Sequence, residues 1–395
     1  MRNFFRLKWE NTFLLILIWF ESVVCLDLFI NHTALDTVID NHKTSPCELL
    51  DSRLNHGQSN HTEPLQENEA WFTACRQEKF KNITEYLSRM NTKLRERNLT
   101  VGIFPAHRPE LKFIASAFRK RGAKVRMISK FKTRGDDWRV QDDILVTYAF
   151  TPKKFQARVD IGLHTLVVEL AYFRGKFKGS THQSYTWDGV NNRGFHPLGL
   201  SDRSASMGKS VKLGKWKAGC SGSVLLLGQL SDDRTQIPIK ERYGTISNMW
   251  AYVVSKVRAQ LNNPIKFKAH PKEVEKVKKY HVPKGTSDVT KKDLMQLIDQ
   301  AYIVIVASST AGVYALQRGV PVVALDPGFV AWDCAQHTLE DLRTLSLPDR
   351  KECLNRILYG QWSNSEMEKG KALDLILDPA AYKMPQLNIS GERRC

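Results

Sequence analysis

The chain has 395 residues, of which 42% are hydrophobic and 10% aromatic, so it can bury two substantial cores and wholesale disorder is excluded. It carries 59 Lys and Arg against 41 Asp and Glu, a formal net charge of +18. This charge predicts an anionic ligand or partner, such as nucleotide phosphates, a polyanionic acceptor, an acidic surface or a nucleic acid. The charge alone does not choose among them.

The N-terminal segment 1–30 predicts entry into the secretory pathway. Basic residues up to Lys8 precede an apolar run over 12–20, which Glu21 interrupts before it resumes. The run fits a cleaved signal peptide as well as an uncleaved signal anchor. We therefore expect a type II membrane protein of the Golgi or ER, or a secreted protein, with the rest of the chain facing the lumen or the outside.

Sequons and cysteines agree with that compartment. Asn-X-Ser/Thr sequons begin at Asn31, Asn60, Asn82, Asn98 and Asn388. Six cysteines follow the leader, at Cys47, Cys75, Cys220, Cys334, Cys353 and Cys395. They allow up to three disulfides and leave fifteen pairings open. None has the spacing of a zinc site, so we assign no metal.

Residues 31–68 are polar without a sustained period and predict a stem. An N-terminal αβ domain is expected over 69–215. Its predicted helices are 71–97 and 110–121, and its predicted strands are 99–105, 124–128, 143–148 and 165–170. The segment 172–203, rich in Gly and aromatic residues, predicts a long loop that binds the acceptor or, alternatively, a surface excursion packed by its own rings.

A C-terminal αβ domain is expected over 216–350. It opens with a strand at 223–230, a polar turn at 231–234 and an amphipathic helix that places Ile246 and Leu261 on one face. A short strand, 265–271, ends in His-Pro, and helices follow at 272–280 and 291–301. The tail 351–395 has helical character and packs back on either domain.

The segment 301–328 predicts a complete parallel β-turn-helix-β unit. Two buried strands, 302–307 and 320–325, flank a Ser-Ser-Thr turn and a short helix that ends at Gly319. Ser308 and Ser309 are expected at the helix N-cap, where phosphate often binds, although a capping serine can serve the helix alone. His270 ends a neighbouring strand, so the two strand ends are expected to share one crevice.

These stretches carry a resemblance to a known family. A strand ending in Gly-Gln at Gln229 with an Asp soon after, then KAHP, then VIVASSTAGVYALQRGVPVVAL resemble the nucleotide-binding half of GT-B glycosyltransferases, particularly bacterial capsule-polysaccharide and sialyltransferase-like enzymes. The likeness covers roughly 222–330. VVELAYFRGKF and YTWDGVNNRG resemble a block in glycosyltransferase-like proteins of bacteria and phages. The resemblance implies two Rossmann-like domains facing a central cleft.

The resemblance also implies roles for particular residues. His270, Ser308 and Ser309 would hold the donor phosphate, Thr310 and Gly312 would shape the close approach, and Gln229 would complete the donor set. An imidazole and hydroxyls can stabilise a departing nucleotide without a metal, and the chain has no DxD motif. No cofactor is expected beyond the nucleotide sugar as co-substrate, with a glycan, neutral or anionic, as acceptor. Alone, His270 would more simply be a packed strand-end histidine.

An inverting transfer needs a base for the acceptor hydroxyl. Asp188, in the turn Trp187-Asp188-Gly189, is the first choice, and Glu169, near the end of strand 165–170, is the second. Aspartates in such turns often make only a local Asx turn. Glu169 can alternatively bind an acceptor hydroxyl or pair with Arg174.

The functional hypothesis is thus a metal-independent glycosyltransferase, with hexosyl and sialyl- or Kdo-type transfer both open. The alternative is a non-catalytic carbohydrate- or polyanion-binding protein on the same scaffold. Nucleic-acid binding fits the charge, but the leader and sequons argue against it. A sulfotransferase lacks its phosphate-binding loop.

Overall fold

The computed structural model describes residues 65–129, 139–148, 158–172, 182–197, 213–276, 280–382 and 389–394. The chain divides into two compact units, 1–78 and 79–395, and the second contains every strand of the described residues. The leader predicted at 1–30 lies outside the described part. None of the helices within the described ranges is long and apolar enough to cross a membrane.

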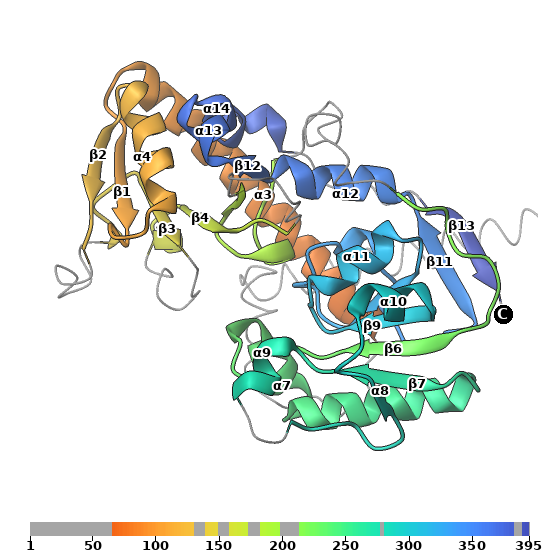
Figure 1. Ribbon diagram of the computed structural model, residues 1–395. Coiled ribbons are helices and arrows are strands. Elements are labelled where there is room, and N and C mark those ends of the chain that lie inside the picture. The colour runs from red at the N-terminus through yellow and green to blue at the C-terminus, as the bar shows by residue number, and fades with distance from the viewer. Residues whose placement is uncertain are drawn as a thin grey trace, which may run out of the picture. The chain divides into compact units, whose positions relative to one another are not determined.

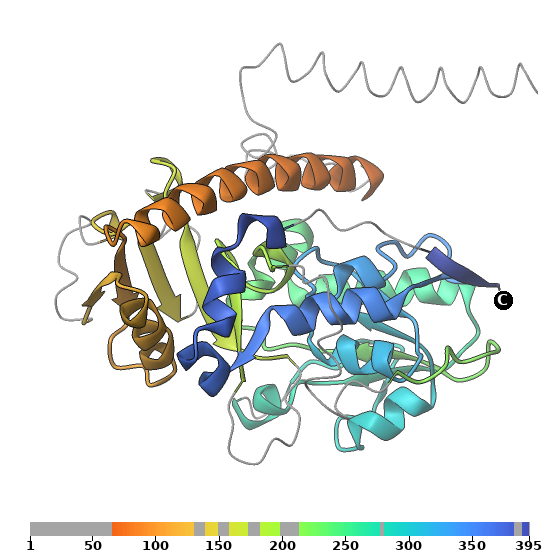
Figure 2. The same ribbon diagram turned by 90° about the horizontal axis from the view of Figure 1, so that it is seen from above.

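Helix α3 (Leu65–Arg95) is unbroken and begins six residues before the predicted start (Figure 2). The prediction of a stem up to residue 68 is therefore wrong at its end, because LQENEA consists mostly of good helix formers that need no apolar stripe to join the helix. Further along, Ile83, Tyr86, Leu87 and Met90 are buried at helical spacing.

The first sheet has six strands in the order β12-β5-β4-β3-β1-β2 (Figure 1). Its parallel strands are β1 (Thr100–Phe104), β2 (Lys124–Met127), β3 (Ile144–Tyr148) and β4 (Thr165–Leu170). Helix α4 (Glu110–Lys120) buries Leu111, Ile114, Ala115 and Phe118 in the core of this sheet. The β/α alternation predicted for this half is confirmed.

The prediction of a long loop over 172–203 is wrong for residues 182–187, which form a strand. Strand β5 (His182–Trp187) pairs antiparallel with β4, and the 3-10 helix η3 (Asn191–Arg193) follows. Tyr185 and Trp187, two residues apart, are both fully buried in the first core. The period of two was present in the sequence, but the polar residues between the rings hid it, because this strand is covered on both faces.

The second sheet is parallel throughout, in the order β10-β9-β6-β7-β8. Its strands are β6 (Ser223–Leu227), β7 (Ile265–Lys268), β8 (Ser287–Asp288), β9 (Ala301–Val306) and β10 (Val322–Ala324). Its helices are η5 (Arg234–Gln236), α7 (Ile237–Tyr243), α8 (Ile246–Gln260), α9 (Pro271–Lys276), α10 (Leu294–Asp299), α11 (Ala311–Gln317) and η6 (Trp332–Cys334). The β-turn-helix-β unit predicted at 301–328 is present as β9, α11 and β10.

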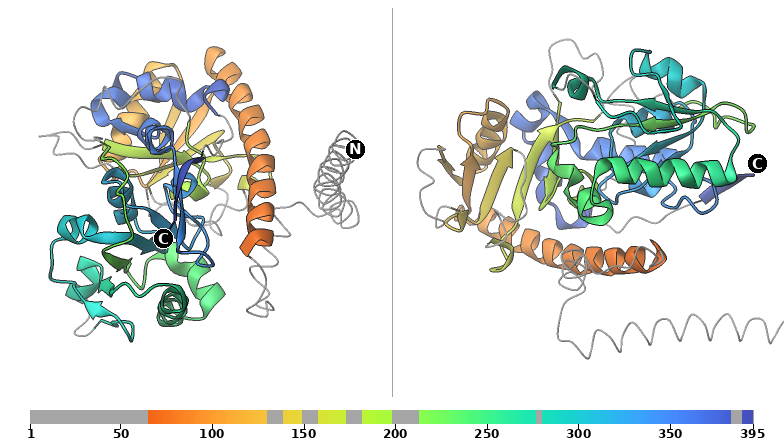
Figure 3. Two further views of the ribbon diagram at one scale, coloured as in Figure 1. Left: turned by 90° about the vertical axis from the view of Figure 1, so that its right-hand side faces the viewer. Right: turned by 90° about the horizontal axis from the view of Figure 1, so that it is seen from below.

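The C-terminal part of the chain adds one strand to the first sheet and forms a separate two-stranded sheet. Strands β11 (Thr344–Pro348) and β13 (Ile389–Arg394) pair with each other, and β12 (Gln361–Ser363) pairs with β5. The remaining elements are α12 (Arg350–Tyr359), α13 (Asn364–Glu368), α14 (Lys371–Leu377) and η7 (Pro379–Ala381). Helix α12 packs in the second core and carries Cys353, which is disulfide-bonded to Cys334; α13 and α14 pack beside α4 (Figure 3). The predicted helical character is correct only between these strands.

Candidate functional site

The strands of the second sheet bring four polar side chains to one edge. Asp326 follows β10, Ser308 follows β9, Gln229 follows β6 and His270 follows β7, and these strands are neighbours in that order. Because the strands are parallel, all four residues lie at the carboxyl edge, where ligands bind in open α/β sheets. The predicted donor residues Gln229, His270 and Ser308 are therefore brought to a single edge.

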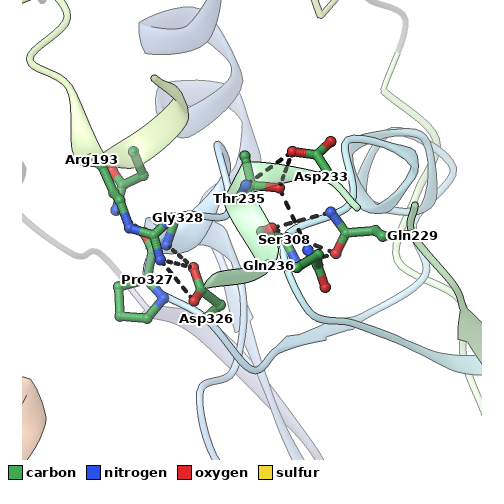
Figure 4. A network of polar contacts seen from close by, with 10 residues as sticks. Arg193, Gln229, Asp233, Thr235, Gln236, Ser308, Asp326, Pro327 and Gly328 are labelled. Carbon is green, nitrogen blue, oxygen red and sulfur yellow. Dashed lines mark hydrogen bonds and ion pairs between the residues drawn. The ribbon is translucent and has the colours of Figure 1, made fainter. Parts of the chain in front are cut away.

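Gln229 and Ser308 bind each other directly (Figure 4). The Gln229 Oε1 accepts the Ser308 backbone N–H at 2.9 Å, and its Nε2 donates to the Ser308 Oγ at 3.2 Å. Ser308 is almost fully buried. Its hydroxyl donates to the Gln229 Oε1 only at a long 3.5 Å, a weak bond that a ligand oxygen can replace, whereas its backbone N–H is already satisfied.

The capping of α11 differs from the expectation. The N-cap is Thr310, which makes no side-chain capping bond, while the Ser309 Oγ accepts the Ala311 N–H at a long 3.4 Å. Helix α11 has seven residues, so its dipole is small, and we place the phosphate donors on side chains instead. Gly312 leaves room for a ring: a Cβ there would lie 2.9 Å from the Phe329 Cζ.

His270 is held in one tautomer. Its Nδ1 accepts the backbone N–H of Lys272 at 3.2 Å, so in the neutral ring the proton resides on Nε2. Burial, followed by the charge of Lys272, lowers the pKa of His270 below its usual value. At neutral pH the imidazole is therefore uncharged and offers one N–H donor at the carboxyl edge.

Asp233 is a residue that sequence reasoning assigned only to a polar turn. Its Oδ1 accepts the Thr235 N–H at 2.9 Å and the Thr235 Oγ1 hydroxyl at 3.0 Å, which fixes the carboxylate in the loop after β6 (Figure 4). Its charge opposes part of the lowering of the His270 pKa, and it adds to the raising of the Glu169 pKa. The sequence signal that could have indicated Asp233 as a site residue was its position four residues after Gln229.

Glu169 lies at the carboxyl end of β4 in the first sheet, opposite Ser184 of β5. Burial, with a smaller contribution from the negative charge of Asp233, raises its pKa to about 7. No described residue forms a hydrogen bond or ion pair with this carboxylate; Arg174, its predicted alternative partner, lies outside the described ranges. A carboxyl group with a pKa near neutrality suits proton transfer.

Asp188 lies at the other end of β4. It adopts a left-handed conformation with φ 54°, its Oδ1 accepts the Thr165 N–H at 2.7 Å, and its Oδ2 pairs with the His164 Nδ1. Thr165 is the first residue of β4, so the length of that strand separates Asp188 from Glu169. Both Asp188 oxygens are therefore engaged away from the carboxyl edge, which favours Glu169, the second choice of base; the roles of both residues stay predictions.

An ion pair and a hydrogen bond link the two sheets. Arg193 of η3 places its Nη2 2.7 and 2.8 Å from the two carboxylate oxygens of Asp326 (Figure 4). The Asn192 Nδ2 donates to the Pro327 carbonyl at 2.9 Å. Burial raises the pKa of Asp326, and Arg193 counteracts part of that effect. This pair connects the segment after β5 to the end of β10.

No protein-family model and no curated protein matches the chain. Solved structures do resemble it at a distance. The β-Kdo 2,7-transferase KpsC of Thermosulfurimonas dismutans is 14% identical, with a TM-score of 0.41 over 70% of this chain and 99% of that one. A β-Kdo 2,4-transferase KpsC of that organism is 14% identical, with a TM-score of 0.37 over 57% and 79%.

A third resemblance is to the UDP-GlcNAc 2-epimerase of Methanocaldococcus jannaschii in complex with UDP-GlcNAc and UDP. It is 11% identical, with a TM-score of 0.25 over 74% of this chain and 95% of that one. At these values the likenesses carry no argument about activity or site residues. The site must be judged on its own side chains.

Those side chains combine a neutral N–H donor, a half-buried carboxyl group with a pKa near 7 and a second carboxyl group. His270, Glu169 and Asp233 come from two sheets, and Asp233 contributes to the pKa shifts of the other two. The three can donate to an anion, accept a proton and stabilise a developing positive charge. Among the described residues no group of three His, Cys, Asp or Glu could hold a metal ion; metal independence stays a prediction.

Proposed function

We propose that the chain is a glycosyltransferase that moves a sugar from a nucleotide-sugar donor to a glycan. The observation that carries the proposal is the gathering of Gln229, His270 and Ser308 at the carboxyl ends of three parallel strands. The raised pKa of Glu169, about 7, caused by burial and by Asp233, adds a carboxyl group suited to act as the acceptor base.

In the proposed reaction the acceptor hydroxyl oxygen bonds to the anomeric carbon of the donor while the bond from that carbon to the phosphate oxygen breaks. The hydroxyl proton passes to the Glu169 carboxylate. The nucleotide leaves with the electron pair, and the His270 Nε2–H and the Ser308 hydroxyl donate to its phosphate. The Asp233 side chain stabilises the positive charge that develops on the sugar. This scheme gives an inverted product and uses no metal.

The place of action is proposed as the lumen of the secretory pathway. The support is the leader pattern of residues 1–30 and the sequons. Asn82 and Asn98, the two sequon residues within the described ranges, are both exposed.

The alternative, a non-catalytic glycan-binding protein, draws support from one observation. The Ser308 N–H, which a donor phosphate would use, is already bound by the Gln229 side chain. When the hydrogen-bond donors of a site are already bound by neighbouring side chains, the protein can lack nucleotide binding and still bind the glycan acceptor.

Calorimetry on the full chain with UDP, GDP and CMP tests the donor site. We expect one nucleotide to bind, and His270→Ala to weaken it about tenfold through the loss of one hydrogen bond to a charged group. The matched control is His281→Ala, an exposed histidine of the same half. Absence of binding by a folded parent, or equal effects of the two variants, would contradict the donor site and leave the glycan-binding alternative.

A further inference from the structure

Arg108 is an exposed arginine in the connection between β1 and α4, and it is held by a ring. Its guanidinium carbon lies 4.3 Å from the centroid of the Tyr148 ring. Within the described ranges no carboxylate forms an ion pair with it. A guanidinium stacked on an aromatic face keeps its N–H donors directed outward around its rim, so it is oriented for a planar or tetrahedral anion without being neutralised.

This arginine lies at the same edge of the sheet as Glu169. Tyr148 is the last residue of β3 and is aligned with Val168 of β4, one residue before Glu169. Arg108 follows the carboxyl end of β1, the neighbour of β3 on its other side. The Arg108–Tyr148 pair and the proposed base are therefore at adjacent strand ends.

The pleat of the sheet limits which ligand can contact both. Aligned residues of parallel strands share a face, so Tyr148 projects with Val168, and Glu169 projects from the opposite face. A ligand that reaches both must cross the edge of the sheet. We expect an oligosaccharide, rather than a single sugar, to follow that path.

The net charge of the chain, +18, agrees with an anionic ligand. A positive charge of this size raises the local concentration of anionic ligands and their association rates.

We propose that Arg108, oriented by Tyr148, is an acceptor subsite for a carboxylate, sulfate or phosphate group of an anionic oligosaccharide. This rests on the transferase function proposed above. The anionic group belongs to a different sugar residue from the one that presents its hydroxyl to Glu169. Arg108 selects the acceptor and takes no part in the chemical step.

The test is a glycan array probed with the full chain. The array pairs sialylated, uronate-containing, sulfated and phosphorylated oligosaccharides with asialo, carboxyl-reduced, desulfated and dephosphorylated counterparts. We expect at least one anionic class to be retained over its neutral counterparts, and Arg108→Gln to reduce that retention about tenfold, the effect of one charged hydrogen-bonding partner. The class retained identifies the anionic group.

Arg119→Gln is the matched control, because Arg119 is exposed in the last turn of α4 and its loss changes the net charge equally. We expect it to change retention less than twofold, and Arg108→Lys to give an intermediate value because charge remains while the planar fork is lost. Equal effects of Arg108→Gln and Arg119→Gln, or retention of neutral glycans alone, would overturn the subsite.

Nucleotide binding by the same variants separates this proposal from the proposed function. Arg108→Gln should bind UDP, GDP or CMP as the parent does. If the parent binds no nucleotide but Arg108→Gln still loses anionic glycans selectively, the transferase function fails and the subsite stands. If nucleotide binding is intact and glycan selectivity is unchanged in Arg108→Gln, the subsite fails alone.

Discussion

At the scale of single residues, the site depends on protonation states that neighbours impose. Glu169 and Asp233 are both carboxylic acids, but burial pushes the first towards neutrality, while the second is anchored by Thr235. A carboxyl group with a raised pKa and a carboxyl group fixed by hydrogen bonds can take different roles in one reaction. His270 completes the set as an uncharged donor because its Nδ1 is occupied by the Lys272 N–H.

Activity should rise with pH through about 7, because Glu169 must lose its proton to act as a base. Glu169→Gln should abolish this rise of activity with pH, and it should lower turnover at least about a hundredfold, the usual contribution of a general base. It should leave nucleotide affinity unchanged. A pH profile of transfer, or of donor hydrolysis, measures the effect; full activity in the variant would remove Glu169 from the mechanism.

Glu169 also predicts a pH dependence of stability. Its folded-state pKa lies above its ordinary value of 4.5, so between pH 4.5 and about 7 the folded state binds more protons than the unfolded state. The contribution of Glu169 to stability is therefore full below 4.5 and lost as pH rises to about 7. Urea unfolding should show Glu169→Gln more stable than the parent by on the order of 1 kcal/mol at pH 8, and not at pH 4.5.

At the scale of elements, the connection from α11 to β10 requires a glycine at one position. Gly319 has φ 77°, the left-handed exit that the sequence predicts. A Cβ at this position would lie 1.8 Å from the carbonyl oxygen of Lys215, whose segment passes against the turn. The backbone conformation and the close approach both require glycine here.

Gly319→Ala should therefore lower the free energy of unfolding by about 2–4 kcal/mol, combining a strained backbone with a steric clash. Gly162→Ala is the matched control, because Gly162 has φ 67° but nothing within 4 Å of the added Cβ. It should cost only about 1 kcal/mol. Equal losses in urea unfolding would show that the clash contributes nothing.

At the scale of the whole folded unit, two features join the sheets. The tail packs α12 in the second core and then supplies β12 to the first sheet. The Arg193–Asp326 pair joins the segment after β5 to the end of β10. Asp326 is 3% exposed, whereas Arg193 is 29% exposed, so removal of the arginine leaves the more deeply buried charge without its partner.

Arg193→Ala should cost about 3 kcal/mol of stability at pH 7, the usual effect of leaving a buried charge unpaired. Burial already raises the pKa of Asp326, so the loss should shrink as pH falls and this carboxylate takes up a proton. Adding Asp326→Asn should recover part of the loss at pH 7. Lys276→Ala, which breaks the exposed pair with Asp232, is the control and should cost less than about 1 kcal/mol.

The sequence by itself determined the elements whose signals are local. Runs of Val, Leu and Ile predicted β4, β6 and β9, and Gly319 predicted the end of α11, because short-range sterics and the burial of apolar side chains act within a few residues. For the same reason the strand ends at Gln229, His270 and Ser308 were found.

Only the tertiary structure decided which carboxylate has the properties of a base. Asp188 and Glu169 are both acidic residues beside β4, and no local pattern separates them; the pairing of Asp188 with His164 and the effect of Asp233 on Glu169 do. Strand β12 likewise depends on β5, far away in the chain. Ion pairs, pKa values and edge strands depend on residues distant in sequence, and folding alone brings those residues together.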